Sequence, residues 1–205
     1  MATTPAPPTY AGAWALYEKQ LSNISDEKVD LIIIGDSLAQ MWENNYWRPL
    51  STVNLGVAAD QTQNVLWRLA SPKWKSIKTK NILLVIGTNN LGSNTVCAMI
   101  EGIKSVFRRV HEIWPDAQIA YLAIPPRGDI LSSKDDDRRA ANQVIISSKH
   151  VDVVSEDQDL NPDGSFLLYR QDRLHFLPPA YIMLTNQMVS RLFPKRRSIN
   201  SGSER

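Results

Sequence analysis

Five short runs of apolar, mostly β-branched residues recur along the chain, and segments with helical spacing of apolar residues separate them. Continuous apolar runs of this length are typical of strands that are buried on both faces, as in a parallel sheet. Strands that alternate with helices predict a sheet covered by helices on both sides. We therefore expect an α/β fold, a three-layer α/β/α sandwich around a five-stranded parallel sheet. The predicted strands are residues 30–35, 52–56, 81–87, 118–124 and 151–155.

The segment 93–114 gives the clearest helical signal. Its apolar residues recur at steps of three and four, which describes one buried stripe along a helix. The members of this stripe are Val96, Met99, Ile100, Ile103, Val106, Phe107 and Val110. Further helices are predicted around 14–21, 60–69, 134–148 and 179–193.

The length of 205 residues suits one domain with a sizeable core. Residues 1–10 are rich in Pro and Thr and are predicted to be disordered, residues 11–194 to form the domain, and the basic residues 195–205 to form a flexible tail. A net charge of +2 is too small to indicate a nucleic acid or a membrane surface as the partner.

Cys97 is the single cysteine, which excludes an internal disulfide framework and a cysteine-rich zinc site. Asp135, Asp136 and Asp137 favour a helix N-terminus over a metal site, so we expect no metal and no cofactor. The first residues lack a basic segment followed by an apolar one, and no run is long enough to span a membrane. The expected location is the cytoplasm, although a secreted chain trimmed of its signal would look the same.

Polar residues follow four of the predicted strands, at 35–37, 54–56, 87–90 and 125–128. In parallel sheets, functional groups gather in the loops at the carboxyl ends of the strands. Together these loops offer the hydroxyl of Ser37, the N–H of Gly56 and the side-chain amide of Asn89. Each also has a structural explanation, because Gly56 could serve a turn and Asn89 could cap a helix.

A serine nucleophile needs a base, and the chain has three histidines. His111 falls on the polar side of the predicted helix at 93–114, and His150 falls at a helix C-terminus, where a cation is favoured. His175 follows Asp172 by three residues, a step that brings two side chains to the same side of a turn or helix. Asp172 could orient His175, which would then activate Ser37 as in a serine hydrolase.

The motif around Ser37 is "GDSLA", with Ala39 where the nucleophile elbow of α/β-hydrolases, G-x-S-x-G, has glycine. This departure argues against the α/β-hydrolase fold.

Four blocks in order resemble those of the SGNH hydrolases, also called GDSL esterases/lipases, over residues 31–193. They are "GDSL" at 35–38, "NLG" at 54–56, "GTNN" at 87–90 and "DRLH" at 172–175. The resemblance implies a flavodoxin-like sheet order and a catalytic triad of Ser37, Asp172 and His175. It also implies an oxyanion hole formed by Ser37, Gly56 and Asn89, rather than Asn90.

Within the family, "VLWRL", "GTNN" and "PPRG" look most like the platelet-activating-factor acetylhydrolase catalytic subunits and their bacterial relatives. This implies a metal-independent serine esterase that removes a short acyl group, with acetyl preferred, from a small-molecule ester. It also suggests a homodimer. Ala58 and Ala59 stand where relatives usually carry glycine, which affects the expected acyl and alcohol preference. The alternatives are a thioesterase or lysophospholipase with a longer acyl preference, and a non-catalytic binding subunit of the same fold.

Other conspicuous residues favour structural roles. Asp36 is expected to cap a helix, and the "RGD" at 127–129 is expected to form a turn at the edge of the site. Trp42, Trp47 and Trp67 are expected to pack in and around the core.

Overall fold

The computed structural model describes residues 2–148, 153–154 and 160–193. Its centre is a parallel sheet in the order β2-β1-β3-β4-β5, which is the flavodoxin-like order expected from the family resemblance. The strands are β1 (Leu31–Gly35), β2 (Thr52–Gly56), β3 (Asn81–Val85), β4 (Gln118–Tyr121) and β5 (Val153–Val154). The first four have four or five residues each. Of the strand predicted over 151–155, residues 151, 152 and 155 lie outside the described residues, and the described β5 pairs with Ala120 and Tyr121.

Except for the short α2, which is not among the predicted segments, the helices agree with the prediction to within a few residues. They are α1 (Ala11–Ser22), α2 (Ser37–Gln40), α3 (Thr62–Arg68), α4 (Val96–Ile113), α5 (Asp135–Ser147) and α6 (Pro178–Leu192). Short 3₁₀ helices lie at Asn44–Trp47, Pro72–Ser76, Thr88–Gly92 and Ser132–Lys134.

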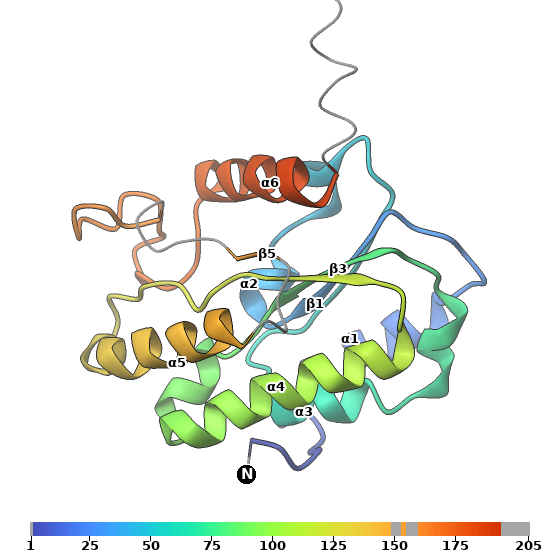
Figure 1. Cartoon of the computed structure of the whole chain (residues 1–205), viewed down its shortest axis with the longest axis horizontal. Coiled ribbons are helices and arrows are strands. Elements are labelled where there is room, and N and C mark those ends of the chain that lie inside the picture. Colours follow the sequence, from blue (N-terminus) through green and yellow to red (C-terminus); the bar gives the residue numbers. More distant parts are fainter. Residues whose placement is uncertain (1, 149–152, 155–159, 194–205) are drawn as a thin grey trace, which may run out of the picture.

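Alternate residues of each central strand enter two different hydrophobic clusters. In β1, Ile32 and Ile34 pack with α1, α3, α4 and α5, while Leu31 and Ile33 pack with α2 and α6. Figure 1 shows the resulting layers, with α6 on one side of the sheet and α4 and α3 on the other. Burial on both faces explains why the strands are continuously apolar, and it confirms the three-layer α/β/α prediction.

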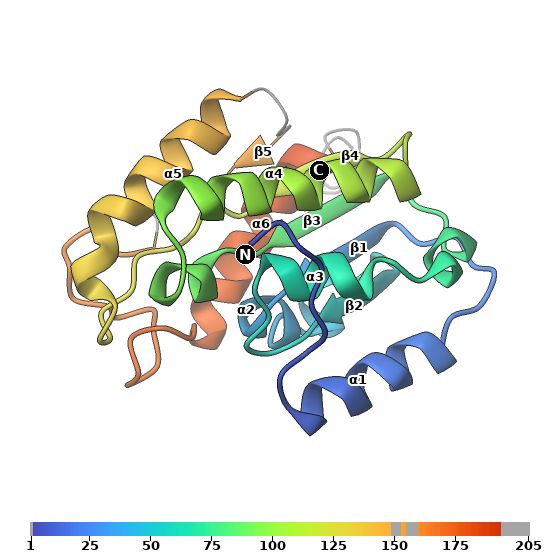
Figure 2. The same ribbon diagram turned by 90° about the horizontal axis from the view of Figure 1, so that it is seen from below.

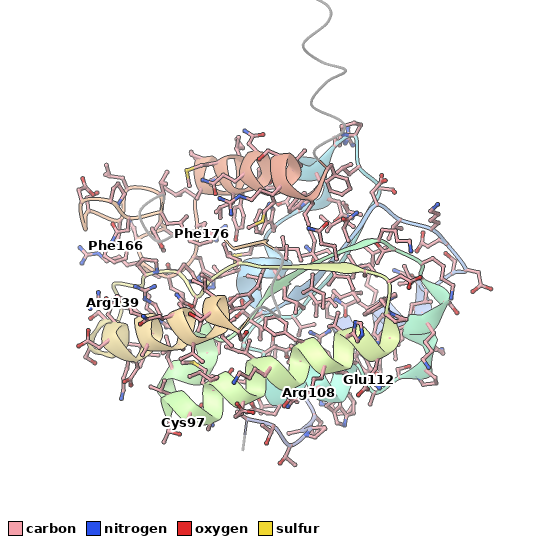
Figure 3. All side chains as sticks on the ribbon, in the orientation of Figure 1. Cys97, Arg108, Glu112, Arg139, Phe166 and Phe176 are labelled. Atoms are coloured by element: carbon pink, nitrogen blue, oxygen red, sulfur yellow. The ribbon has the colours of Figure 1, made fainter. Side chains whose placement is uncertain are left out.

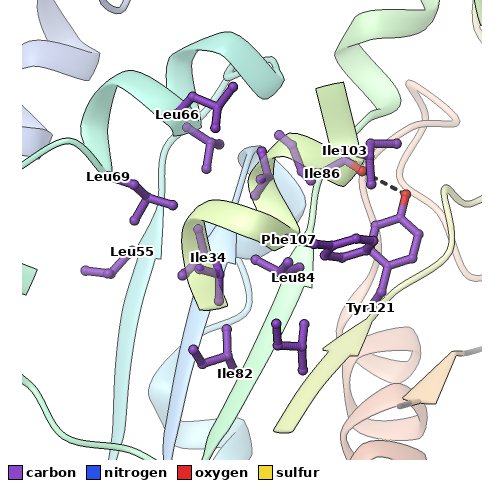
Figure 4. Packing of buried hydrophobic residues seen from close by; sticks show 14 of the residues in the cluster. Ile34, Leu55, Leu66, Leu69, Ile82, Leu84, Ile86, Ile103, Phe107 and Tyr121 are labelled. Carbon is purple, nitrogen blue, oxygen red and sulfur yellow. Dashed lines mark hydrogen bonds between the residues drawn. The ribbon is translucent and has the colours of Figure 1, made fainter. Parts of the chain in front are cut away.

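The larger cluster is built around α4. Its predicted stripe faces the sheet, and Phe107 stands edge-on to Tyr121 of β4 (Figure 4). The phenol of Tyr121 donates a hydrogen bond to the carbonyl of Ile86 at 3.1 Å, so the one polar atom of this buried ring is satisfied.

The tryptophan predictions are confirmed. Trp42 and Trp47 are fully buried in the α6 cluster, where their ring centroids lie 4.9 Å apart. Trp67 is partly buried and packs against Trp14 and Tyr17 of α1.

The N-terminal segment was predicted to be disordered, but the structure shows it packed against α3 (Figure 2). Ala2 is buried and its carbonyl accepts from Thr62 Oγ1 at 2.8 Å, while the side-chain amide of Asn64 donates to the carbonyls of Ala6 and Pro7. Polar side chains of α3 therefore order a segment that has too few apolar residues to pack on its own. The predicted tail at 195–205 lies outside the described residues. Within them, no helix is long and apolar enough to cross a membrane.

Gly56 ends β2 against the backbone of α2. A Cβ at this position would lie 2.2 Å from the backbone nitrogen of Gln40, closer than any side chain can approach. Gly56→Ala is therefore expected to lower the free energy of unfolding by about 3 kcal/mol, the upper end of the range for overpacking. Urea denaturation measures this change.

Gly92→Ala is the matched control, because a Cβ there would meet only the end of the Leu131 side chain at 3.2 Å. Equal stability of the Gly56→Ala and Gly92→Ala variants would contradict the close-approach explanation.

Candidate active site

Ser37 is the first residue of α2, directly beyond the carboxyl end of β1. Asp36 caps this helix as predicted, since its Oδ1 accepts from the Leu38 N–H at 2.9 Å. Gly35 is required before the turn, because a Cβ there would lie 1.9 Å from the carbonyl oxygen of Val85. The strand-to-helix junction thus holds Ser37, only 6% exposed, at the carboxyl edge of the sheet.

His175 is held by a hairpin-like loop before α6. Tyr169 and Phe176 form an antiparallel bridge, and the Arg170 N–H donates to the His175 carbonyl at 2.7 Å. Asp172 Oδ1 accepts from the backbone N–H groups of Leu174 and His175 at 3.0 and 2.9 Å. Contacts within the loop therefore fix the carboxylate and the imidazole relative to each other, without any contribution from Ser37.

The three predicted residues form one hydrogen-bonded chain. His175 Nδ1 lies 2.8 Å from Asp172 Oδ2, and His175 Nε2 lies 2.9 Å from Ser37 Oγ, across 138 residues of sequence. A carboxylate can only accept, so Nδ1 carries the proton that it donates to Asp172. Nε2 is then the acceptor for the hydroxyl of Ser37.

Asp172 is poised to stay ionised. The small burial of its carboxyl raises its pKa, but the hydrogen bonds from the His175 ring and from two backbone N–H groups outweigh this and lower the pKa to about 2. A negative charge is thus present beside Nδ1 across the neutral pH range.

Asn89 lies in the 3₁₀ helix after β3. Its Nδ2 donates to the carbonyl of Asp60 at 2.9 Å, which leaves the second amide hydrogen for another acceptor. The neighbouring Asn90 is fully buried, and its side chain holds the N-terminus of α3 through the N–H and the hydroxyl of Thr62. Of the two asparagines of "GTNN", Asn89 therefore keeps an amide hydrogen for another acceptor, whereas the side chain of Asn90 is engaged at the start of α3.

Gly56 does not present a free N–H. Its single amide hydrogen is donated to Asn54 Oδ1 at 2.8 Å, so its place in the motif is explained by the close approach to α2 rather than by an oxyanion contact.

The β2–α3 loop, residues 57–61, has one unpaired amide among the described residues. The N–H groups of Val57, Ala58, Asp60 and Gln61 donate to Gly35 O, Gln40 Oε1, Val57 O and Asn64 Oδ1 respectively. Ala59 has no such partner, and its φ of 63° places it in the left-handed region that favours glycine. Sequence reasoning missed Ala59, although the loss of glycine at this point was the available signal.

Arg68 of α3 ties this loop to the sheet. It is fully buried, and its guanidinium pairs with Asp60 Oδ2 at 2.7 Å while donating to the carbonyls of Leu55 and Gly35. Burial raises the pKa of Asp60 to about 6 against the opposing effect of Arg68. The backbone carbonyl of Asp60 also accepts a hydrogen bond from the side-chain amide of Asn89. The Arg68–Asp60 ion pair therefore helps to fix the position of Asn89.

The other histidines stay apart from this group. His111 is exposed on α4, and His150 lies outside the described residues. No cluster of three metal-binding side chains occurs among the residues that the structure describes.

The hydrogen-bonded chain of a serine, an imidazole and a carboxylate lies at the carboxyl edge of a sheet ordered 2-1-3-4-5. This combination is typical of the SGNH class of serine hydrolase architecture. Among proteins similar to the chain, platelet-activating factor acetylhydrolase IB subunit alpha1 from Rattus norvegicus is 32% identical over 140 residues, 65% of this chain and 60% of that protein. Subunit alpha2 from Homo sapiens is 31% identical over 147 residues, 69% of this chain and 63% of that protein.

A solved GDSL-like lipase from Bacteroides thetaiotaomicron VPI-5482 has a TM-score of 0.67 over 89% of this chain and 98% of that chain, at 11% identity. No protein-family model matches the chain. The matches to the two acetylhydrolase subunits span 60% and 63% of the length of those curated relatives. The chain is thus similar in sequence to these acetylhydrolase subunits and in fold to a GDSL-like lipase, in agreement with its resemblance to the SGNH hydrolases.

Asp36 combines a helix cap with a costly burial. Its Oδ2 is buried and has no hydrogen-bond partner among the described residues, and desolvation raises its pKa to about 7 despite the Leu38 N–H. An unfolded aspartate ionises near pH 3.9. The folded state therefore resists an ionisation that the unfolded state allows, and Asp36 lowers stability progressively as pH rises from about 4 to about 7.

Asp36→Asn keeps a capping oxygen and removes this ionisation. Its melting temperature relative to the parent protein is expected to rise between about pH 4.5 and about pH 8, as the parent loses the stability described above. Thermal unfolding across this range measures the difference, with the exposed Asp26→Asn as the control. A difference that does not change with pH would contradict the raised pKa of Asp36.

Proposed function

We propose that the protein is a metal-independent serine esterase that hydrolyses carboxylic esters through an acyl-enzyme on Ser37. The observation that carries this proposal is the continuous hydrogen-bonded chain from Ser37 Oγ through His175 to Asp172. A serine hydroxyl is a weak nucleophile until an adjacent base takes its proton. The geometry supplies that base, together with a carboxylate that orients it.

In the first half-reaction, Ser37 Oγ attacks the ester carbonyl while His175 Nε2 accepts the hydroxyl proton. The imidazolium that forms is stabilised by the ionised Asp172. His175 then protonates the leaving alcohol, and the acyl group stays on Ser37. In the second half-reaction, water attacks the acyl carbon while His175 Nε2 accepts one of its protons. The bond from the acyl carbon to Ser37 Oγ then breaks, His175 returns the proton to Oγ, and the carboxylic acid leaves.

The developing oxyanion needs donors on the side opposite to the imidazole. We assign this role to the N–H of Ser37, the side-chain amide of Asn89 and the N–H of Ala59. Ala59 replaces the Gly56 of the sequence prediction, because the Gly56 N–H is already donated to Asn54. Support for Ala59 comes from its unpaired N–H among the described residues and from its place beside Asp60, which holds Asn89.

For the acyl group we propose acetyl or another short chain. The support is the name of the relatives, which describes them as acetylhydrolases of platelet-activating factor. p-Nitrophenyl esters of graded chain length test this assignment. A peak of activity at long chains would instead favour a thioesterase or lysophospholipase.

Ser37→Ala removes the nucleophile and is expected to reduce ester hydrolysis to background, because the triad acts as a unit. p-Nitrophenyl acetate hydrolysis and labelling by a fluorophosphonate probe measure the loss. Ser133→Ala, an exposed serine outside the triad, is the control. Full esterase activity in the Ser37→Ala variant would overturn the mechanism, and absence of labelling in the parent protein would favour a non-catalytic binding subunit.

Asn89→Ala removes one oxyanion donor and is expected to lower kcat by about 10²-fold or more. Because Asn89 also donates to Asp60, thermal unfolding must accompany the kinetics. The exposed Asn45→Ala is the matched control. An Asn89→Ala variant that is folded and has unchanged kcat would remove this residue from the oxyanion hole.

A further inference from the structure

A cavity of about 670 Å³ is lined by four arginines, one of which, Arg173, lies on the loop that carries Asp172 and His175. We call it the arginine cavity and define it by Arg127, Arg138, Arg139 and Arg173, with Gly128 and Phe166 in its wall. Figure 3 shows Arg139 on α5 and Phe166 on the 160–170 segment at the same end of the molecule. Its volume is in the range of small-molecule sites.

The walls of the cavity continue into the candidate active site. The Gly128 N–H donates to the carbonyl of Arg173 at 2.9 Å, and Arg173 precedes His175 by two residues. On the other side, Arg127 Nη1 donates to the carbonyl of Thr88 at 2.9 Å, and Thr88 directly precedes Asn89. The cavity wall is therefore hydrogen-bonded to the loop that carries His175 and to the segment that carries Asn89.

Three of the four arginines have carboxylate partners. Arg127 pairs with Asp129, and Arg138 and Arg139 pair with Asp135. These pairs leave the guanidinium of Arg173, which forms no ion pair and no side-chain hydrogen bond with any described residue. A planar guanidinium with free donors is suited to bidentate binding of a carboxylate or a phosphate.

Arg173 is held in place by backbone geometry and packing. Its φ is 51°, and that of Phe166 is 57°, both in the region that non-glycine residues seldom adopt. A Cβ on Gly128 would lie 2.9 Å from both Arg173 Cδ and Phe166 Cε2, so the two side chains cover this glycine closely. The stem of Arg173 therefore lies close over Gly128 at the cavity wall, and its exposed guanidinium has no charge partner among the described residues.

We propose that the arginine cavity binds an anionic group, a carboxylate or phosphate, carried by the alcohol half of the ester substrate, with Arg173 as the residue that pairs with it. The proposal rests on the esterase function above. The alcohol half is assigned because the leaving oxygen must lie next to the imidazole that protonates it, and Arg173 lies on the loop of that imidazole. Arg173 thus determines specificity without touching the reacting atoms.

The kinetic test compares two pairs of acetyl esters, each pair differing in one charge. Para-acetoxybenzoate is compared with para-acetoxybenzamide, and acetylglycerol phosphate with acetylglycerol, so that carboxylate and phosphate are distinguished. The measured quantity is the ratio of kcat/KM for the anionic ester to kcat/KM for its neutral counterpart. Since hydrogen bonds to charged groups contribute about 1.5–3 kcal/mol, loss of the guanidinium should lower this ratio by about 10-fold or more.

Arg173→Asn removes the charge with a residue that tolerates a left-handed backbone, and Arg173→Lys keeps the charge without the planar fork. The Asn variant is expected to lower the ratio about 10-fold and the Lys variant to lower it less. Arg108→Gln on the exposed face of α4 is the matched control, with an unchanged ratio (Figure 3). The ratio is the chosen readout because a displaced His175 would slow both esters of a pair equally and leave the ratio unchanged. A ratio near unity in the parent protein, or a ratio that Arg173→Asn leaves unchanged, overturns the proposal.

A binding measurement separates this proposal from the esterase function. Inorganic phosphate and benzoate are titrated calorimetrically into the Ser37→Ala variant and into the same variant with Arg173→Asn. Weaker binding by about 10-fold in the second protein supports the anion site even if the parent hydrolyses no ester. Equal binding by the two proteins, or no binding by either, overturns the site even if the parent is an active esterase.

Discussion

The buried guanidinium of Arg68 is the interaction on which the rest of the site depends. It donates to the carbonyls of Gly35 and Leu55, near the ends of β1 and β2, and it pairs with Asp60 in the loop that follows β2. A single cation thus connects the strand that delivers Ser37 to the loop that presents Ala59 and receives Asn89. A buried charge is costly unless fully paired, and the carboxylate and the two carbonyls supply that pairing.

The layout of the sheet follows from the sequence because burial on both faces requires strands of continuous apolar character. Of the predicted strand at 151–155, the structure describes Val153 and Val154, which pair with Ala120 and Tyr121. The disorder predicted for the N-terminal segment differs from the structure, in which the described part of that segment is ordered. Its order comes from hydrogen bonds to Thr62 and Asn64 on α3, and no local pattern in a Pro- and Thr-rich stretch reports such partners.

The candidate triad could be predicted because its chemistry restricts the residue types and because the chain has few histidines. The donors of the proposed oxyanion hole were harder to predict from the sequence. A motif can indicate that the β2–α3 loop matters, but only the structure reveals which N–H groups are engaged. Gly56 looks catalytic in sequence, but glycine is needed there because the backbone of Gln40 lies so close. Ala59 stands out in sequence only as a replaced glycine, yet its N–H has no hydrogen-bond partner among the described residues. Arg68 was equally hidden, since an arginine in an amphipathic helix gives no sign of being fully buried.

The separation of 138 residues between Ser37 and His175 has a consequence for the making of the protein. The loop at 169–177 assembles Asp172 and His175 from neighbouring residues, so the base and its orienting carboxylate need little of the remaining fold. Ser37, in contrast, is brought to His175 by the tertiary fold and not by neighbouring residues. During synthesis its hydroxyl stays an ordinary alcohol until the sheet has formed and the late loop has docked. In the proposed esterase, activation of Ser37 therefore requires the completed tertiary structure, and a partly made chain would carry no activated serine.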